Sequence, residues 1–301
     1  MSDRQGRVRV AGTGYDHTIF GFRGANEPAP FVLPDGKELV VTPIVVLQRF
    51  HIDAKPPFAV PGMLARPWPD IGTATQREVG LHDGLRRVLD AFDEAEAAAT
   101  FVVEADALPH LPDMRKRLAA SPHGIVAGGR HAVGLHGSHL TEEEEAGIIA
   151  VVKTELEAFF GREVAGWRSP YNAQSASTLS LLARNGFSYC GDLNNDERPY
   201  MLDAGGQSLW AVSMPHTTSD LHNIEISKQT AEDFFLAQLR GIDWLLDSSE
   251  RRPIVYPLVL HPWIVGVPHR IAALASFLRD VASRRRAAFW STDQLVAACR
   301  R

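Results

Sequence analysis

Polar residues able to do acid–base or anion-binding chemistry stand at the ends of four apolar runs of this sequence. The runs are LVVTPIVVL, HAVGL, VAGW and IVYPLVL, and the residues that end them are Gln48, His136, Arg168 and His261. An imidazole titrates near neutral pH, and a guanidinium can hold an anion. If the runs are parallel strands, their carboxyl ends share one face, where α/β folds place ligand sites. The pattern therefore predicts one shared ligand site.

A metal centre is a second interpretation of residues in the same regions. His51, Asp53, His136 and His139 could supply three or four nitrogen and oxygen ligands, enough for a catalytic zinc ion with an open position. Such an ion would lower the pKa of its bound water to about 7. The spacing of His136 and His139 is weak support, because it lacks the helical context of a metalloprotease motif. We expect no cofactor, with one divalent metal such as zinc as the alternative.

Apolar periodicity indicates the elements that must position these residues. Strands are expected at 39–47, 100–103, 131–135, 164–167, 254–260 and 289–292. Helices are expected at 85–92, 142–160, 177–185, 235–246 and 272–281, and a long loop with five prolines at 53–80. The second helix has a capping box at Thr141 and Glu144 and ends at Gly161. Strands that alternate with helices favour a parallel sheet with crossover helices, as a barrel or a doubly wound sheet.

Composition limits the class of protein. The chain has 301 residues, a formal net charge of −5, 45% hydrophobic residues and two cysteines. Its slight acidity argues against nucleic acid or an anionic membrane as the main partner. No stretch approaches the roughly 18 apolar residues of a membrane span, and two cysteines cannot form a disulfide framework, so a cytoplasmic protein is expected. Residues 1–38 are predicted to be an irregular arm and residues 39–301 a single domain.

Several motifs together resemble those of a known family. They are GLHGS, GWRSPYN, GFSYCGDLNNDERPY and, most specific, LHPWIVGVPHRI. The chain from about Phe31 to its C-terminus resembles the polysaccharide deacetylase (NodB-homology, carbohydrate esterase family 4) superfamily. It is most similar to the branch of metal-independent allantoinases and cyclic imide hydrolases. The resemblance implies a deformed (β/α) barrel of the NodB type and hydrolysis of a non-peptide C–N bond.

The chain departs from the deacetylase pattern at the positions that would bind a metal. The two carboxylates that end the first strand in deacetylases fall on Gln48 and Arg49, and the second histidine of their pair falls on Leu140. An amide does not titrate and so cannot be a base, and an arginine repels a cation. The resemblance therefore implies that the inherited metal site is dismantled. The substitute set of His51, Asp53, His136 and His139 stays open as the alternative.

Hydrolysis by water needs a base, an acid for the departing nitrogen and donors for the oxyanion. His136 and His261 could divide the acid and base roles, and Asp53 could orient one of them or be the base itself. Arg168 could hold a carboxylate or the oxyanion. Gln48 could bind an imide or ureide edge, and the aromatic candidates for the pocket walls are Trp167, Tyr171 and Trp263.

Three hypotheses follow. The first is a hydrolase of a small polar amide, cyclic imide or ureide. The second is a metal-dependent deacetylase of an amino sugar or small N-acyl metabolite. The third is a ligand-binding protein on a catalytically decayed fold, because the carboxylate position of the first motif is Gln48. The expected partners are a small-molecule substrate and further copies of this chain in a homo-oligomer.

Overall fold

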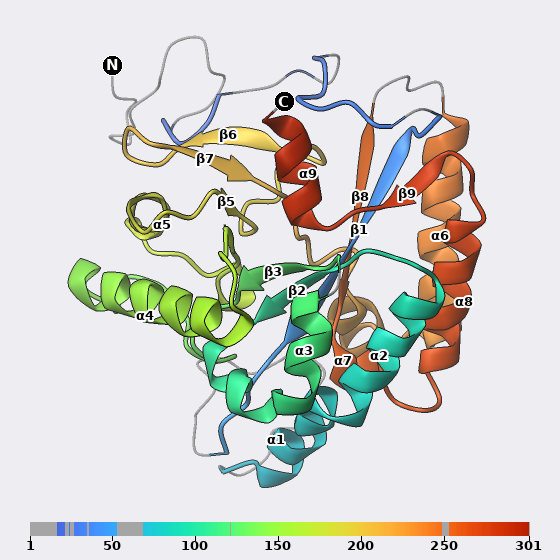
Figure 1. Cartoon of the computed structure of the whole chain (residues 1–301), viewed down its shortest axis with the longest axis horizontal. Coiled ribbons are helices and arrows are strands. Elements are labelled where there is room, and N and C mark those ends of the chain that lie inside the picture. The colour runs from blue at the N-terminus through green and yellow to red at the C-terminus, as the bar shows by residue number, and fades with distance from the viewer. Residues whose placement is uncertain are drawn as a thin grey trace.

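The computed structural model describes residues 17–21, 24, 27–34, 36–52, 69–120, 122–248 and 253–300. Within these ranges, one curled sheet carries nine strands in the order β6-β7-β5-β4-β3-β2-β1-β8, with β9 paired to β1 (Figure 1). Every pairing is parallel except that of β6 with β7. The strands are β1 (Leu39–Leu47), β2 (Thr100–Val103), β3 (Gly124–Ala127), β4 (Gly166–Trp167), β5 (Tyr189–Cys190), β6 (Tyr200–Asp203), β7 (Ser208–Ala211), β8 (Ile254–Leu260) and β9 (Ala287–Phe289).

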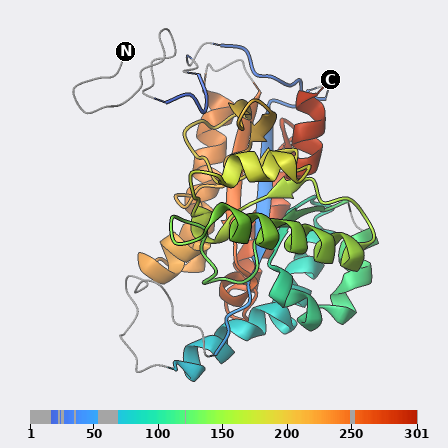
Figure 2. The ribbon, with the colours of Figure 1, turned by 90° about the vertical axis from the view of Figure 1, so that its left-hand side faces the viewer.

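Helices cover the outer face of the sheet and its two ends. They are α1 (Ile71–Glu78), α2 (Asp83–Glu94), α3 (Pro112–Ala120), α4 (Glu142–Phe160), α5 (Thr178–Arg184), α6 (Ala231–Asp247), α7 (Pro262–Val265), α8 (Ile271–Ala282) and α9 (Thr292–Cys299). Figure 2 shows α4 and α5 together on one side of the strands. In Figure 1, α1 and α7 lie at the end where β1 and β8 finish, and α9 lies at the opposite end.

β1 is buried on both faces, as its continuous run of branched residues predicts. Ile44 and Val46 belong to a core inside the curled sheet, whereas Val45 and Leu47 belong to the core under the helices. The alternation follows from the two-residue period of a strand. Each such side chain contributes about 1.5–3 kcal/mol by its burial. β1 therefore ties the inner and outer layers together, and its carboxyl end is held firmly in place.

The described part of the N-terminal segment adds to the inner core. Phe31 is buried with Leu295 and Val296 of α9, at the end of the sheet where the strands begin. The arm and the single domain remain a prediction. Among the described residues, no helix combines the length and the apolar character needed to cross a bilayer.

Several predicted elements are confirmed. β1, β2 and β8 have the predicted bounds, and α4 begins and ends at the predicted caps. Thr141 and Glu144 form the reciprocal hydrogen bonds of a capping box, and Gly161 adopts φ 68°. This φ is in the left-handed region, where glycine has no steric penalty.

Other predicted elements are wrong. HAVGL at 131–135 is a loop, and the strand of that region is β3, formed by the earlier run GIVA. The run 289–292 is split between the end of β9 and the start of α9, because Ser291 caps that helix. The predicted loop at 53–80 contains α1, and its residues 53–68 lie outside the described part of the chain.

Candidate active site at the carboxyl ends of the strands

The ends of β1 and β2 bring an amide and a carboxyl together. The parallel pairing of Leu47 with Val103 places the next two residues, Gln48 and Glu104, side by side. Gln48 is 8% exposed and Glu104 is 1% exposed. The backbone N–H of Arg49 donates to Glu104 Oε2 at 2.6 Å. Glu104 is not among the predicted site residues, although it directly follows a predicted strand, as Gln48 does.

Burial governs the ionisation of Glu104. It raises the pKa of this carboxyl well above its ordinary value. The Arg49 N–H, the charge of Arg168 and a hydrogen bond with the Gln48 side chain oppose the shift without cancelling it. A carboxyl with a raised pKa can exchange protons closer to neutral pH than an ordinary glutamate does.

Arg168 follows β4 and is buried. Its Nη2 donates to Asn172 Oδ1 at 2.9 Å, whereas its Nε has no hydrogen-bond partner among the described residues. Burial lowers the pKa of Arg168, and the charges of Asp192 and Glu104 oppose that shift. Because a guanidinium remains protonated in proteins, Arg168 offers a buried cation with an unused donor. Asp192, which follows β5, was also overlooked in the sequence.

The chain after Arg168 is strained. Tyr171 and Asn172 have φ values of 54° and 57°, in the left-handed region. Strain of about 1–3 kcal/mol per residue is characteristic of functional sites. Burial raises the pKa of Tyr171, while the charges of Arg77 and Arg168 lower it. Both arginines therefore lie close enough to act on the charge of this phenol, and its place at the site stays a prediction.

His261 follows β8 and is paired with a carboxylate. Asp220 accepts from the backbone N–H of His261 at 2.7 Å, and its Oδ1 lies 2.6 Å from the ring Nδ1. An ionised carboxylate can only accept, so the proton between Asp220 and the ring belongs to Nδ1. A bridge between Ser219 and Val259 brings Asp220 to the end of β8. The sequence analysis overlooked Asp220 because it lies 41 residues before His261.

Shared contacts connect these strand ends. Burial lowers the pKa of His216, and the charges of Arg168 and His261 lower it further, so His216 lies within reach of both. Trp263 Nε1 donates to Gln48 Oε1 at 3.4 Å, and the rings of Trp263 and His261 are 6.2 Å apart. These contacts connect Gln48, Arg168 and His261, and the shared ligand site predicted for these three with His136 stays a prediction.

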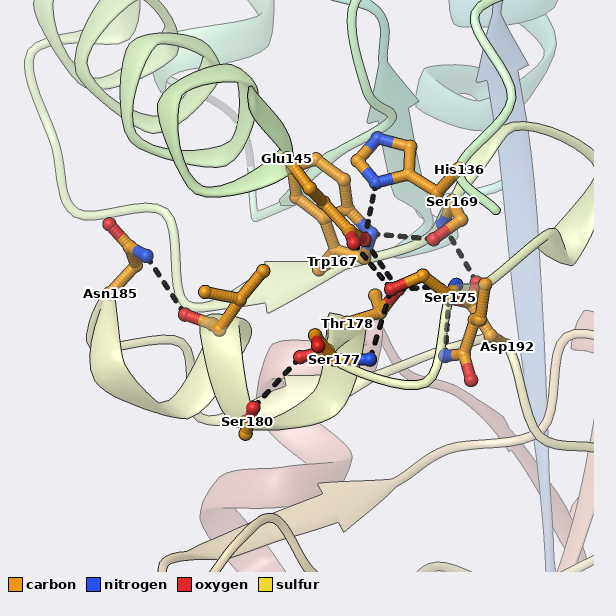
Figure 3. Close-up of polar contacts among 12 residues, drawn as sticks. His136, Glu145, Trp167, Ser169, Ser175, Ser177, Thr178, Ser180, Asn185 and Asp192 are labelled. Atoms are coloured by element: carbon orange, nitrogen blue, oxygen red, sulfur yellow. Dashed lines mark hydrogen bonds and ion pairs between the residues drawn. The ribbon is translucent and has the colours of Figure 1, made fainter. Parts of the chain in front are cut away.

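His136 belongs to a neighbouring cluster, shown in Figure 3. Its Nδ1 lies 2.8 Å from Glu145 Oε1, and its Nε2 is buried without a partner among the described residues. Glu145 also accepts from Ser175 Oγ and Thr178 Oγ1. Burial alone would raise the pKa of Glu145, but these hydrogen bonds outweigh it and lower the pKa below its ordinary value.

Trp167 does not lie where it was predicted. It is fully buried in the core under the helices, stacks edge-on against His136 at 5.4 Å and donates from Nε1 to Ser169 Oγ at 2.8 Å. The physical reason is strand alternation, because Trp167 and Arg168 face opposite sides of the sheet. Trp167 therefore supports the site from behind and does not form a wall open to a ligand.

The predicted metal ligands do not assemble. His51 Nε2 lies 2.8 Å from Asp106, His139 is exposed, and Asp53 lies outside the described residues. The described residues contain no group of three or more histidine, cysteine or carboxylate side chains that could hold an ion. At the inherited position, the guanidinium of Arg49 is a cation with no lone pair to donate, and the amide of Gln48 offers one neutral oxygen in place of a carboxylate, so the pair does not fit a divalent cation.

Solved structures with this fold include an allantoinase and polysaccharide deacetylases. The allantoinase Puue matches with a TM-score of 0.83 and 21% identity, over 94% of this chain and 97% of that chain. A Mycobacterium smegmatis protein assigned as a polysaccharide deacetylase matches with a TM-score of 0.74 and 24% identity, over 91% of this chain and 94% of that chain. The structure therefore confirms the deformed (β/α) barrel of the NodB type.

A curated relative covers less of the chain. The peptidoglycan deacetylase-like protein FGM2 of Gibberella zeae is 24% identical over 198 residues, which are 52% of this chain. The match spans 58% of that relative's length. No protein-family model matches the sequence.

Proposed function

We propose that this protein hydrolyses a non-peptide C–N bond of a small polar amide, cyclic imide or ureide. The observation that carries the proposal is the buried pair of His261 and Asp220 at the end of β8, on the same edge of the sheet as the buried Arg168, whose Nε has no partner among the described residues. The names of the similar proteins agree with this reaction class, since deacetylases and an allantoinase cleave C–N bonds.

In the proposed reaction, water attacks a carbonyl carbon and the carbonyl oxygen becomes an oxyanion. Arg168 stabilises that charge, and one donor of this kind contributes about 10²–10³-fold to the rate. His261, oriented by Asp220, passes a proton from Nε2 to the departing nitrogen. General acid catalysis of this kind contributes about 10²–10⁴-fold. Tyr171 and Trp263 bound the space beside these groups.

A cyclic imide or ureide fits this site better than an N-acetyl sugar. Beside its contacts with Trp263 and Glu104, the Gln48 amide has a second N–H and a second oxygen lone pair, and an imide edge alternates acceptor and donor groups in the same way. The metal-dependent deacetylase is the weaker candidate because the inherited ligand positions are Gln48, Arg49 and Leu140. A decayed enzyme that only binds its ligand is a second candidate, because Gln48 stands at the carboxylate position of the first motif.

A turnover screen tests the proposal. Purified protein is incubated with succinimide, allantoin or N-acetylglucosamine, with and without EDTA, and products are followed by proton NMR. We expect hydrolysis of the imide or the ureide that EDTA leaves unchanged. Release of acetate that EDTA abolishes would favour the metal-dependent deacetylase. A probe that raises the melting temperature without being hydrolysed would favour the binding protein.

A further inference from the structure

The proposed reaction leaves the proton of the attacking water without an acceptor. Gln48 stands where the first strand ends, but an amide does not titrate. The adjacent Arg49 is a cation and has no lone pair to accept a proton. His261 is assigned to the departing nitrogen, so the site needs another group that can change its protonation state.

Most carboxyl groups around the site are committed elsewhere. Asp220 holds His261 through both oxygens. Asp192 accepts from the Ser169 N–H at 2.7 Å on one oxygen and from Gln174 Nε2 at 2.8 Å on the other. Asp106, whose charge reaches Glu104, is paired with His51 and Arg130. Among the described residues, this leaves Glu104, which lies beside Gln48.

We propose that Glu104 is the general base of the site, a catalytic residue on β2 that does the work Gln48 cannot do on β1. This inference rests on the proposed function. The register of β1 and β2 puts the two side chains next to each other, and neighbouring strands are only about 4.8 Å apart. A carboxyl at the end of β2 can therefore reach the same water as one at the end of β1. Arg168 and Tyr171 lie within range of its charge.

The step balances with the groups present. The Glu104 carboxylate takes one proton from water while the water oxygen bonds to the carbonyl carbon and the carbonyl electron pair moves onto oxygen. The oxyanion then collapses, the C–N bond breaks, and the nitrogen takes a proton from the His261 imidazolium. Glu104 then releases its proton to solvent, and His261 takes up a proton from solvent. The sum is amide plus water to carboxylic acid plus amine.

The surroundings of Glu104 suit this role. Burial raises its pKa, which brings the basicity of the carboxylate closer to that needed for general base catalysis at neutral pH. The Arg49 N–H bonds to one of its oxygens and fixes the orientation of the group. Gln48 at the end of β1 accepts a hydrogen bond from Trp263 and forms a side-chain hydrogen bond with Glu104 at the end of β2. In this arrangement Gln48 positions Glu104.

The test compares Glu104→Gln with a matched control, Asp293→Asn. Asp293 is a partly buried carboxyl at the opposite end of the sheet, where it accepts from the Tyr189 hydroxyl at 2.7 Å, and burial also raises its pKa. With the probe that the wild type hydrolyses, we expect kcat to fall about 10²–10⁴-fold in Glu104→Gln and to stay within threefold in Asp293→Asn. We expect the kcat of the wild type to fall at low pH and this fall to be absent from the residual activity of Glu104→Gln.

Glu104→Asp covers the case in which the amide variant does not fold. It keeps a carboxylate, so it should retain more activity than Glu104→Gln and keep the fall of kcat at low pH. If the wild type and Glu104→Gln differ by less than threefold in kcat, or share one pH profile, the assignment of Glu104 is wrong while the proposed function stands. If Glu104→Gln does not fold, loss of the fall at low pH in Glu104→Asp overturns the assignment. If the wild type hydrolyses no probe, both fall together.

Discussion

Two buried glutamates show how this molecule uses the same side chain in two ways. Glu104 at the end of β2 and Glu145 on α4 are each 1% exposed, and burial by itself raises the pKa of both. The pKa of Glu104 remains well above its ordinary value, whereas the pKa of Glu145 ends below it. The exposed fraction is the same, but Glu104 lies deeper in the protein, so burial raises its pKa more, and the hydrogen-bond donors around Glu145 bring the pKa of that carboxyl down.

The donors differ in number and kind. Glu145 receives side-chain hydrogen bonds from Ser175, Thr178 and His136, which satisfy it as an anion. Glu104 receives one backbone N–H and the Gln48 amide and lies near an arginine that shares its charge with Asp192. A fully satisfied carboxylate anchors structure, whereas an incompletely satisfied one can still exchange a proton. We therefore expect Glu145 and its donors to control stability and Glu104 to control turnover.

The largest effect is expected at His261, which belongs with Glu104 to the strand-end site where we expect the chemistry. His261→Ala should lower kcat about 10²–10⁴-fold, or about 3–5 kcal/mol in activation free energy, while the melting temperature changes little. Asp220→Asn should have a loss of similar size, because the amide no longer holds the proton on Nδ1. Steady-state kinetics on the probe that the wild type hydrolyses measure both.

The double variant of His261 and Asp220 sharpens this result. Residues that act as a unit are not additive, so the double variant should be no slower than His261→Ala. Independent, additive losses would contradict the pairing of these two side chains. A wild-type rate in His261→Ala would show that His261 takes no part in the reaction.

The next effect concerns stability and the other glutamate. Glu145→Gln replaces an acceptor by an amide whose NH₂ must face a donor, and each stranded buried group costs about 1–3 kcal/mol. Urea denaturation should show that loss in the free energy of unfolding. Glu143→Gln, an exposed change on the same helix, should stay within about 0.5 kcal/mol of the wild type. Equal stability of the two variants would remove the structural role of Glu145.

The smallest effect is a difference in pH dependence. The raised pKa of Glu104 means that its carboxylate destabilises the folded state as pH rises above the ordinary glutamate value of 4.5. Glu104→Gln should therefore gain stability relative to the wild type above that pH. The lowered pKa of Glu145 has the opposite sign: its contribution is present above pH 4.5 and is lost as pH falls below it. Melting temperatures across this range measure both trends, and trends of the same sign would contradict the comparison.

Much of the framework could be predicted from local patterns. The branched run of β1 and the capping box of α4 are local signals, because a strand buried on both faces needs continuous apolar residues and a helix end needs a side-chain acceptor. The failure at HAVGL is also local in origin. Its five residues have the composition of a strand, but the shorter run GIVA in β3 pairs between β2 and β4.

Three residues of the candidate site could be predicted from their position along the chain. Polar residues directly after an apolar run identified Gln48, Arg168 and His261, and applied to TFVV the rule would also have selected Glu104. Trp167 was misplaced because a single residue decides which face of a strand a side chain occupies. Nothing in the sequence marks the partners Asp220 and Glu145, since histidine–carboxylate pairs form across the fold.

The sequence by itself determined β1, β2, β8 and the capped helix α4, and it indicated the kinds of groups that follow these strands, because these features depend on neighbours along the chain. The tertiary structure alone decided which carboxyl lies beside Gln48, which acid holds each histidine and which arginine nitrogen keeps a free donor. Strand register and the approach of Ser219 to Val259 decide these relationships. Both are contacts between residues far apart in sequence, and their free energy exists only once the whole sheet has formed.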